Sequence, residues 1–166
     1  MKNIVLIGMM GAGKTTIAKY LSQVLSIDYI DMDEYIENKY KMSISDMFHI
    51  SENYFREKEA QVCYELSLKD NIILSTGGGI IKNENNIKLL KNNGIIIYID
   101  RPIDSIYKDI DITNRPLLKN NKDILYDLYN QRHDKYLKAC DYHLINDSTL
   151  EDIIEKIVKY LQNRNT

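Results

Sequence analysis

The chain has 166 residues, a formal net charge of −2 and 28% charged residues. This length is usual for one domain and is large enough to bury a hydrophobic core. A net charge so close to zero provides no general basic field, so we expect no nucleic-acid partner. No apolar run approaches the length of a membrane span, and a core-type strand from residue 3 leads us to expect no signal or transit peptide. The composition therefore predicts a cytoplasmic protein with no membrane partner and a single domain over residues 1–166.

Apolar runs typical of buried strands alternate with helical patterns along the chain, which predicts an α/β fold with a parallel sheet between helices. The expected strands are Asn3–Ile7, Asp28–Ile30, Ile72–Ser75, Ile95–Ile99 and Tyr142–Ile145. The expected helices are Lys14–Leu25, Asp33–Lys39, Ser45–Phe48, Glu52–Leu68, Glu84–Asn92, Pro102–Asp109, Lys122–Cys140 and Thr149–Gln162. Polar residues interrupt the pattern between Ile110 and Asn121, which indicates a mobile surface segment. Ligands of such sheets bind at the carboxyl ends of the strands, so the residues that follow each strand are the candidates for a site.

The stretch that follows the first strand, Gly8 to Thr16, fits the phosphate-binding pattern G-x-x-x-x-G-K-[ST]. Its glycines allow consecutive backbone N–H groups to approach a phosphate chain closely. We expect Lys14 to reach the β- and γ-phosphates of a nucleotide and Thr15 to ligate the accompanying Mg²⁺. The helix that begins here would direct its positive end toward the same phosphates.

Two carboxylates, Asp31 and Asp33, follow the second expected strand. Their period-two spacing points them the same way, which suits a metal contact beside a contact to a substrate hydroxyl. The alternative is that one of them only caps the following helix. Phosphoryl transfer needs both Mg²⁺ and an oriented nucleophile, so the neighbouring phosphate loop favours the functional interpretation.

A second glycine cluster, Gly77-Gly78-Gly79, follows the third expected strand. Exposed N–H groups at a strand end favour an anion or a hydroxyl-rich ligand, and a plain flexible turn is the alternative. Proteins with this type of phosphate loop usually place a metal-binding aspartate at the end of this strand. This chain has Ser75 there, and Asp31 is the residue that could take over the missing role.

Spacing is less informative for the arginines. Arg56 and Glu59 lie three residues apart on an expected helix, which by itself indicates a solvated ion pair. Arg115 precedes a proline in the irregular segment, where it is either a guanidinium that closes over the γ-phosphate or an ordinary surface arginine. Arg132 lies in mid-helix and receives no role from spacing alone.

Three other residue types carry no chemistry that their spacing reveals. No role is assigned to the histidines, the cysteines are expected to be buried reduced thiols, and the tyrosines at helical spacings are expected to be half-buried packing residues. They are His49, His133, His143, Cys63, Cys140, Tyr126, Tyr129 and Tyr136.

Taken in order, these motifs resemble those of the shikimate kinases over essentially the whole chain. The likeness rests on Gly8–Thr15, Asp31-x-Asp33, Phe55-Arg56 with Glu59, Gly77–Gly79, Arg115-Pro116-Leu117-Leu118 and Arg132. The resemblance implies a three-layer P-loop kinase fold with a five-stranded parallel sheet in the order 2-3-1-4-5. It also implies a lid at about residues 110–121 and a substrate-binding region at about residues 31–60. The implied activity is the ATP-dependent phosphorylation of the 3-hydroxyl of shikimate to shikimate 3-phosphate, in aromatic amino acid biosynthesis.

The resemblance also implies a role for each site residue. The catalytic residues would be Lys14, Asp33 and Arg115, and Asp33 would orient or deprotonate the attacking hydroxyl. ATP would be bound by Gly11, Ala12, Gly13, Lys14, Thr15, Thr16 and Arg115. Shikimate would be bound by Asp33, Arg56, Gly78, Gly79 and Arg132, with both arginines on its carboxylate and Glu59 fixing Arg56. Mg²⁺ would be held by Thr15 and Asp31.

Two positions depart from the family pattern. Lys108 stands where the family usually has an adenine-stacking arginine, and Asp134 stands where a proline commonly follows the substrate arginine. We expect a monomer that acts on shikimate and ATP. The alternatives are another kinase of the same fold, acting on gluconate or a nucleoside monophosphate, and a non-catalytic nucleotide-binding regulatory module.

Overall fold

The computed structural model describes residues 2–112, 115–118 and 121–164. Its five parallel strands form one sheet in the order β2-β3-β1-β4-β5, which confirms the expected topology. The strands are β1 (Asn3–Ile7), β2 (Tyr29–Asp31), β3 (Ile73–Ser75), β4 (Gly94–Asp100) and β5 (Tyr142–Ile145).

Helices connect the strands. They are α1 (Lys14–Leu25), α2 (Met32–Tyr40), α3 (Ile44–Ile50), α4 (Glu52–Ser67), α5 (Glu84–Asn92), α6 (Ile103–Asp109), α7 (Ile124–Ala139) and α8 (Leu150–Arg164). Two short 3₁₀ turns, η1 (Ile80–Lys82) and η2 (Pro116–Leu118), complete the described elements. The expected helices are all present, with ends that differ by a few residues, whereas the two 3₁₀ turns were not predicted.

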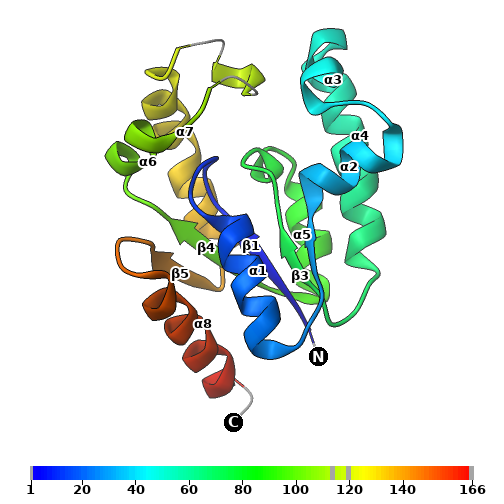
Figure 1. Cartoon of the computed structure of the whole chain (residues 1–166). Coiled ribbons are helices and arrows are strands. Elements are labelled where there is room, and N and C mark those ends of the chain that lie inside the picture. The colour runs from blue at the N-terminus through cyan, green and yellow to red at the C-terminus, as the bar shows by residue number, and fades with distance from the viewer. Residues whose placement is uncertain (1, 113–114, 119–120, 165–166) are drawn as a thin grey trace.

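Different helices cover the two faces of the sheet, which gives the three layers seen in Figure 1. Successive side chains of a strand point to opposite faces. Ile4 and Leu6 of β1 therefore belong to the core cluster that includes residues of α1 and α8. Val5 and Ile7 belong to the cluster on the other face, which includes residues of α4, α5 and α7. Burial on both faces explains why the β1 sequence is continuously apolar.

The parallel pairing brings the strand ends to one edge of the sheet. Asp31 is paired with Ser75, and Ser75 is paired with Leu6 of the central strand β1. Beyond this edge, α2, α3 and α4 rise on one side and α6 and α7 on the other (Figure 1). The segments that follow β1, β2 and β3 therefore meet where the sequence placed the candidate site residues.

The ends of β2 differ from the prediction by one residue. We expected Asp28–Ile30, whereas the strand runs from Tyr29 to Asp31. Its end is set by pairing with β3, which joins Tyr29 to Ile73 and Asp31 to Ser75. This contact spans more than 40 residues of sequence, and local periodicity carries no information about it.

The irregular segment between Ile110 and Asn121 is only partly described. Residues 113–114 and 119–120 of the expected lid lie outside the described residues. In the part that is described, Arg115 precedes the turn η2, and the Leu118 N–H donates to the Arg115 carbonyl at 3.0 Å.

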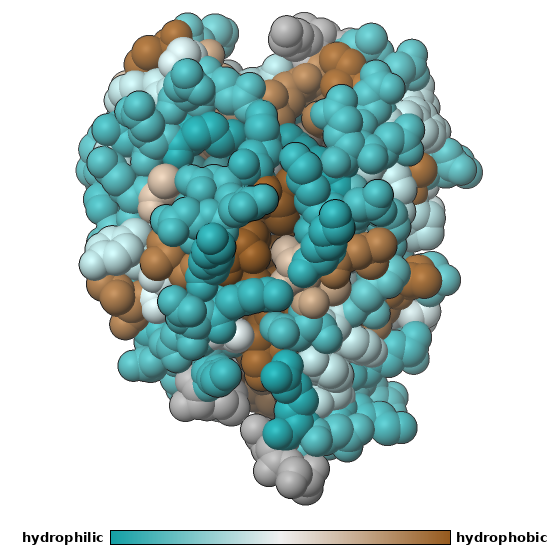
Figure 2. All heavy atoms as spheres, turned by 180° about the vertical axis from the view of Figure 1, so that it is seen from behind, coloured by the Kyte–Doolittle hydropathy of each residue, from teal (hydrophilic) through white to brown (hydrophobic). Residues whose placement is uncertain are grey.

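Among the described residues, no helix combines the length and the apolar character needed to cross a bilayer. The face seen from behind is mostly hydrophilic, with hydrophobic residues exposed in a narrow band near its middle (Figure 2).

Candidate active site

The loop between β1 and α1 has the backbone of a phosphate-binding loop. Gly8, Gly11 and Gly13 have φ angles of 148°, 75° and 97°, a region that residues with a Cβ rarely adopt. Gly13 is also the N-cap residue of α1, so the helix opens directly from the loop. Ala12 is buried, and Thr16 is exposed on the first turn of α1. Backbone N–H groups and the positive end of a helix are therefore presented at one point.

Lys14 is folded back over this loop. Its Nζ donates to the carbonyl oxygens of Gly8 and Met9, each at 2.7 Å. Burial lowers the pKa of Lys14 from 10.5 to about 8, against the opposing effect of the Asp33 carboxylate. A buried cation with only backbone partners gains stability from an incoming anion, as expected of a phosphate-binding lysine.

Oxygen donors gather where α1 meets the ends of β2 and β3. Thr15 Oγ1 donates to Asp31 Oδ2 at 2.5 Å and lies 3.1 Å from Ser75 Oγ. Asp31 Oδ1 accepts the Glu34 N–H at 3.1 Å, so this aspartate caps α2 and also faces Thr15. Asp31 therefore caps α2, as the alternative interpretation expected, and its contact with a metal stays a prediction. Hydroxyl and carboxylate oxygens are the ligands that Mg²⁺ prefers, and this group fits the ion.

The group of oxygen donors is larger than the predicted pair of Thr15 and Asp31, since Ser75 Oγ also lies next to Thr15. In the described ranges, no three His, Cys, Asp or Glu residues lie together as a metal site. The sequence analysis noted Ser75 only as the residue that replaces the usual aspartate at the end of β3, and did not assign it to the metal site.

A cleft of about 550 Å³ opens beside the phosphate loop. It brings together all the predicted shikimate-binding residues and the predicted lid arginine. Its lining consists of Met10, Asp33, Glu37, Ser43, Ile44, Ser45, Phe48, Phe55, Arg56, Glu59, Gly77, Gly78, Gly79, Asp111, Arg115, Pro116, Leu117 and Arg132.

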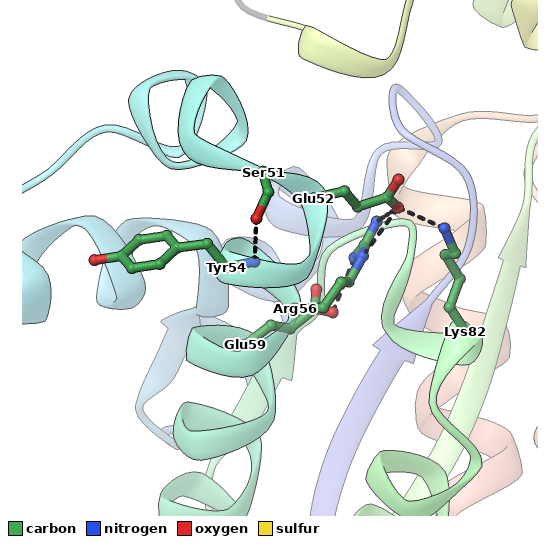
Figure 3. A network of polar contacts seen from close by, with 6 residues as sticks. All are labelled: Ser51, Glu52, Tyr54, Arg56, Glu59 and Lys82. Carbon is green, nitrogen blue, oxygen red and sulfur yellow. Dashed lines mark hydrogen bonds and ion pairs between the residues drawn. The ribbon is translucent and has the colours of Figure 1, made fainter.

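Arg56 is held from several sides at the wall of this cleft (Figure 3). Its Nη1 donates to Glu59 Oε1 at 2.9 Å, and its Nε lies 3.4 Å from Glu52 Oε1. Glu52 in turn pairs with Lys82 of η1 at 2.5 Å, which lowers the pKa of Glu52. Glu59 is 1% exposed and the Arg56 side chain is 19% exposed, so the pair is buried at its Glu59 end and is not the fully solvated pair that spacing indicated.

The second glycine cluster allows Arg56 to take this position. A Cβ built on Gly79 would lie 2.6 Å from Arg56 Cζ, closer than any real contact. A Cβ on Gly77 would lie 2.9 Å from Asp33 Oδ1. The glycines therefore serve a close approach of side chains to the backbone, and their contact with an anion or a hydroxyl-rich ligand stays a prediction.

Three polar atoms in this region lack a hydrogen-bond partner. Asp33 Oδ1, Glu59 Oε2 and Arg132 Nη1 are shielded from solvent, and none has a partner among the described residues. Burial, together with the nearby Asp31 and Glu59 carboxylates, raises the pKa of Asp33 from 3.8 to about 6. Since buried polar groups are normally hydrogen-bonded, such atoms in a cleft indicate a polar ligand.

Arg115 lies on the opposite wall from the α4 side chains and is exposed. Its positive charge adds to the lowering of the Lys14 pKa and opposes part of the rise in the Asp33 pKa. Its guanidinium is therefore within electrostatic reach of both predicted catalytic residues.

Two residues that the sequence did not assign to the site support the phosphate loop. Arg101 Nη1 donates to the Gly11 carbonyl at 3.1 Å, and Asn146 Nδ2 donates to the Ala12 carbonyl at 2.8 Å. Both follow strand ends, Arg101 after β4 and Asn146 after β5. That position was the only signal in the sequence, and it was too general to select them.

The histidines of α7 and β5 have polar partners outside the cleft lining. His143 Nε2 lies 2.8 Å from Asp100 Oδ2, and His133 Nδ1 lies 2.9 Å from the Tyr98 hydroxyl. The two departures from the family pattern, Lys108 and Asp134, are exposed.

Comparisons with known proteins identify the family of the chain. The sequence model of the shikimate kinase family matches residues 10–162. A shikimate kinase of Clostridium botulinum (strain Alaska E43 / Type E3) is 47% identical over 98% of this chain and 99% of its own length. The solved shikimate kinase of Acinetobacter baumannii, in complex with shikimate, has a TM-score of 0.94 and 32% identity, covering 99% of this chain and 94% of that one. The Aquifex aeolicus shikimate kinase has a TM-score of 0.86 and 33% identity, with 98% of each chain covered. The chain belongs to the shikimate kinase family.

Proposed function

We propose that the cleft of this shikimate kinase family member transfers the γ-phosphoryl group of ATP to the 3-hydroxyl of shikimate through the residues assigned below. The observation that carries the assignment is the set of shielded polar atoms on Asp33, Glu59 and Arg132, which face a cleft beside a complete phosphate loop. These atoms require a ligand with both an anionic group and hydroxyl groups. Shikimate, a polyhydroxylated carboxylic acid, has both.

Arg56 and Arg132 would bind the substrate carboxylate. Arg56 is aligned by Glu59 and Glu52, whereas Nη1 of Arg132 has no partner in the described residues. A hydrogen bond to a charged group contributes about 1.5–3 kcal/mol, so two arginines discriminate strongly against polyols that lack the acid. The backbone of Gly78 and Gly79, with Asp33, would contact the ring hydroxyls.

Asp33 would orient the attacking hydroxyl and accept its proton. With a pKa near 6, its carboxyl is ionised at neutral pH and basic enough to take up a proton. The hydroxyl oxygen then forms the new bond to the γ-phosphorus as the bond to the leaving ADP breaks. Lys14 and Arg115 would stabilise the negative charge on the transferred group and on ADP, and closure of the segment around Arg115 would exclude water.

Gly11, Ala12, Gly13, Lys14, Thr15 and Thr16 would hold the ATP phosphates through the loop and the start of α1. Thr15 and Asp31 would hold Mg²⁺, with Ser75 beside them. When bound, this ion would neutralise phosphate charge and fix the geometry of the phosphate chain.

The alternative functions explain fewer features of the cleft. A nucleoside monophosphate has no carboxylate for the pair formed by Arg56 and Arg132. A regulatory module without chemistry would not need Asp33 and Arg115 in electrostatic contact with Lys14. Gluconate carries an acid and hydroxyls, so only direct comparison distinguishes it from shikimate.

The test is ATP consumption by the purified protein with shikimate, gluconate, AMP or no acceptor. We expect turnover with shikimate alone, and a loss of at least about a hundredfold in kcat in Arg115→Ala. Turnover that does not depend on an acceptor, or that prefers gluconate or AMP, would contradict the proposal.

We also propose that the protein is a cytoplasmic monomer, whose activity requires no nucleic acid or membrane. One chain supplies every residue assigned above, so no second copy is required to complete the cleft. Sedimentation equilibrium of the active enzyme, with and without both substrates, tests the oligomeric state.

A further inference from the structure

Tyr136 of α7 contacts the second glycine cluster directly. Its hydroxyl donates to the Gly78 carbonyl at 2.5 Å, and the residue is fully buried. Arg132 lies four residues earlier on α7, and residues with this spacing share one face of a helix. We propose that Tyr136 is a positioning residue for shikimate: through Gly78, it fixes the glycine cluster against Arg132 and the phosphate loop. This inference rests on the substrate-binding roles proposed above.

The backbone at Gly78 has little freedom to move without consequences for the site. A Cβ built on Gly78 would lie 3.2 Å from the Met10 nitrogen and 3.4 Å from Arg132 Nη1. The residue is therefore packed between the phosphate loop and the unpartnered arginine nitrogen. A small shift of Gly78 would change the space available to a ligand at Arg132.

The same hydrogen bond also sets the orientation of the next residue. A trans peptide is planar, so fixing the Gly78 carbonyl fixes the Gly79 N–H, which points the opposite way. Gly79 in turn lies against the Arg56 guanidinium. Tyr136 thereby influences both arginines that we assign to the substrate carboxylate, although it contacts the glycine cluster through a single hydrogen bond.

The hydroxyl is suited to act as a permanent donor. Burial raises the pKa of Tyr136 to about 12, so the group stays protonated throughout the working range of the enzyme. Its ring packs against the Tyr98 ring with centroids 4.9 Å apart. This packing holds the ring in place independently of the hydrogen bond.

The test is Tyr136→Phe, which keeps the ring and removes only the hydroxyl. We expect the KM for shikimate to rise about three- to tenfold, as follows from the loss of one hydrogen bond, while the KM for ATP changes less than about twofold. Tyr98→Phe is the matched control. It also removes one buried tyrosine hydroxyl, but that hydroxyl contacts His133 at 2.9 Å and not the glycine cluster.

A purely structural role for the Tyr136 hydroxyl predicts a different outcome. Both variants would then lower the midpoint of thermal unfolding, and both would leave the KM for shikimate unchanged. That result, or an equal rise in the KM values for shikimate and ATP in Tyr136→Phe, would overturn the inference.

Arg132→Gln separates this inference from the proposed function. If Arg132→Gln leaves the KM for shikimate unchanged, the substrate-binding assignment itself is wrong. If Arg132→Gln raises that KM and Tyr136→Phe does not, the assignment stands and the positioning role of Tyr136 is wrong.

Discussion

The guanidinium of Arg56 lies against the Cα of Gly79, and a Cβ at that position would come within 2.6 Å of Arg56 Cζ. On its other side, Arg56 is tied to the buried Glu59 at 2.9 Å. A methyl group at position 79 would therefore displace the guanidinium and disturb its ion pair with Glu59. This relationship makes a glycine, which itself carries no chemistry, a determinant of carboxylate binding.

Gly79→Ala should therefore impair shikimate binding selectively. We expect the KM for shikimate to rise at least about tenfold, the effect of weakening one charge-assisted hydrogen bond, with little change in the KM for ATP. Steady-state kinetics with each substrate varied in turn measures both values. In the Arg56→Lys background, the added methyl group should have a smaller effect, because the bulky guanidinium is gone. An equal effect in both backgrounds would show that Gly79 acts through some other contact.

Asp33→Asn should abolish transfer while it preserves nucleotide binding. The amide cannot accept the hydroxyl proton, so we expect kcat to fall at least about a hundredfold. The dissociation constant for ATP, measured by calorimetry, should stay within about twofold of the wild-type value. Asp127→Asn, at an exposed position of α7, is the matched control. A collapse of ATP binding in Asp33→Asn would instead assign Asp33 to the metal site.

The stability of the protein without substrates should also depend on Asp33 in a defined pH window. Its pKa is raised from 3.8 to about 6, so the folded state binds more protons than the unfolded state between these values. Wild-type stability should therefore fall as pH rises through this window, relative to Asp33→Asn. The shift in pKa corresponds to a change of up to about 3 kcal/mol in the free energy of unfolding. This change reaches its full size above about pH 6. Urea unfolding of both proteins across the window measures it, and a pH-independent difference would contradict the burial of this carboxyl.

Nucleotide affinity should decline in alkaline solution because of Lys14. Its pKa in the empty loop is about 8, so its attraction for phosphates is lost as pH rises through that value. A fluorescent ATP analogue, titrated on both sides of pH 8, follows this loss. Arginine keeps its charge in this range, so Lys14→Arg should bind with an affinity that does not depend on pH. If both proteins lose affinity in parallel, a group other than Lys14 is titrating.

The oxygen donors around Thr15 should set the magnesium requirement. We expect Asp31→Asn to raise the Mg²⁺ concentration for half-maximal activity about tenfold, and Ser75→Ala to raise it about two- to threefold. Ser67→Ala provides the control, because Ser67 is also a buried serine and its Oγ donates to the Tyr64 carbonyl. Activity measured over a range of Mg²⁺ at saturating ATP gives these values. If the dependence of activity on Mg²⁺ concentration is unchanged in Asp31→Asn, Asp31 does not belong to the metal site.

The sequence predicted the fold well because the strongest signals are local. Hydrophobic periodicity and helix-ending residues placed Asn3–Ile7, Lys14–Leu25, Glu84–Asn92 and Tyr142–Ile145 with the bounds that the structure has. The end of β2 was misplaced because pairing with β3 decides it.

The larger differences between the predicted site and the observed site come from burial. The spacing of Arg56 and Glu59 predicted an ion pair, but the burial of Glu59 comes from tertiary packing, which spacing does not show. The tyrosines were expected to be half-buried, whereas Tyr136 is fully buried and bonded to Gly78, 58 residues away in the sequence. Partners brought together by the fold over such distances leave no periodic pattern.

Gly78 packs between the backbone of the phosphate loop and Arg132, so the two halves of the cleft share one piece of main chain. We expect ordering of that main chain by one ligand to alter the affinity of the other. Thermodynamic reciprocity requires the factor to be the same in both directions. Nucleotide and acceptor should therefore be coupled through one backbone segment, with a coupling strength that is independent of which one binds first.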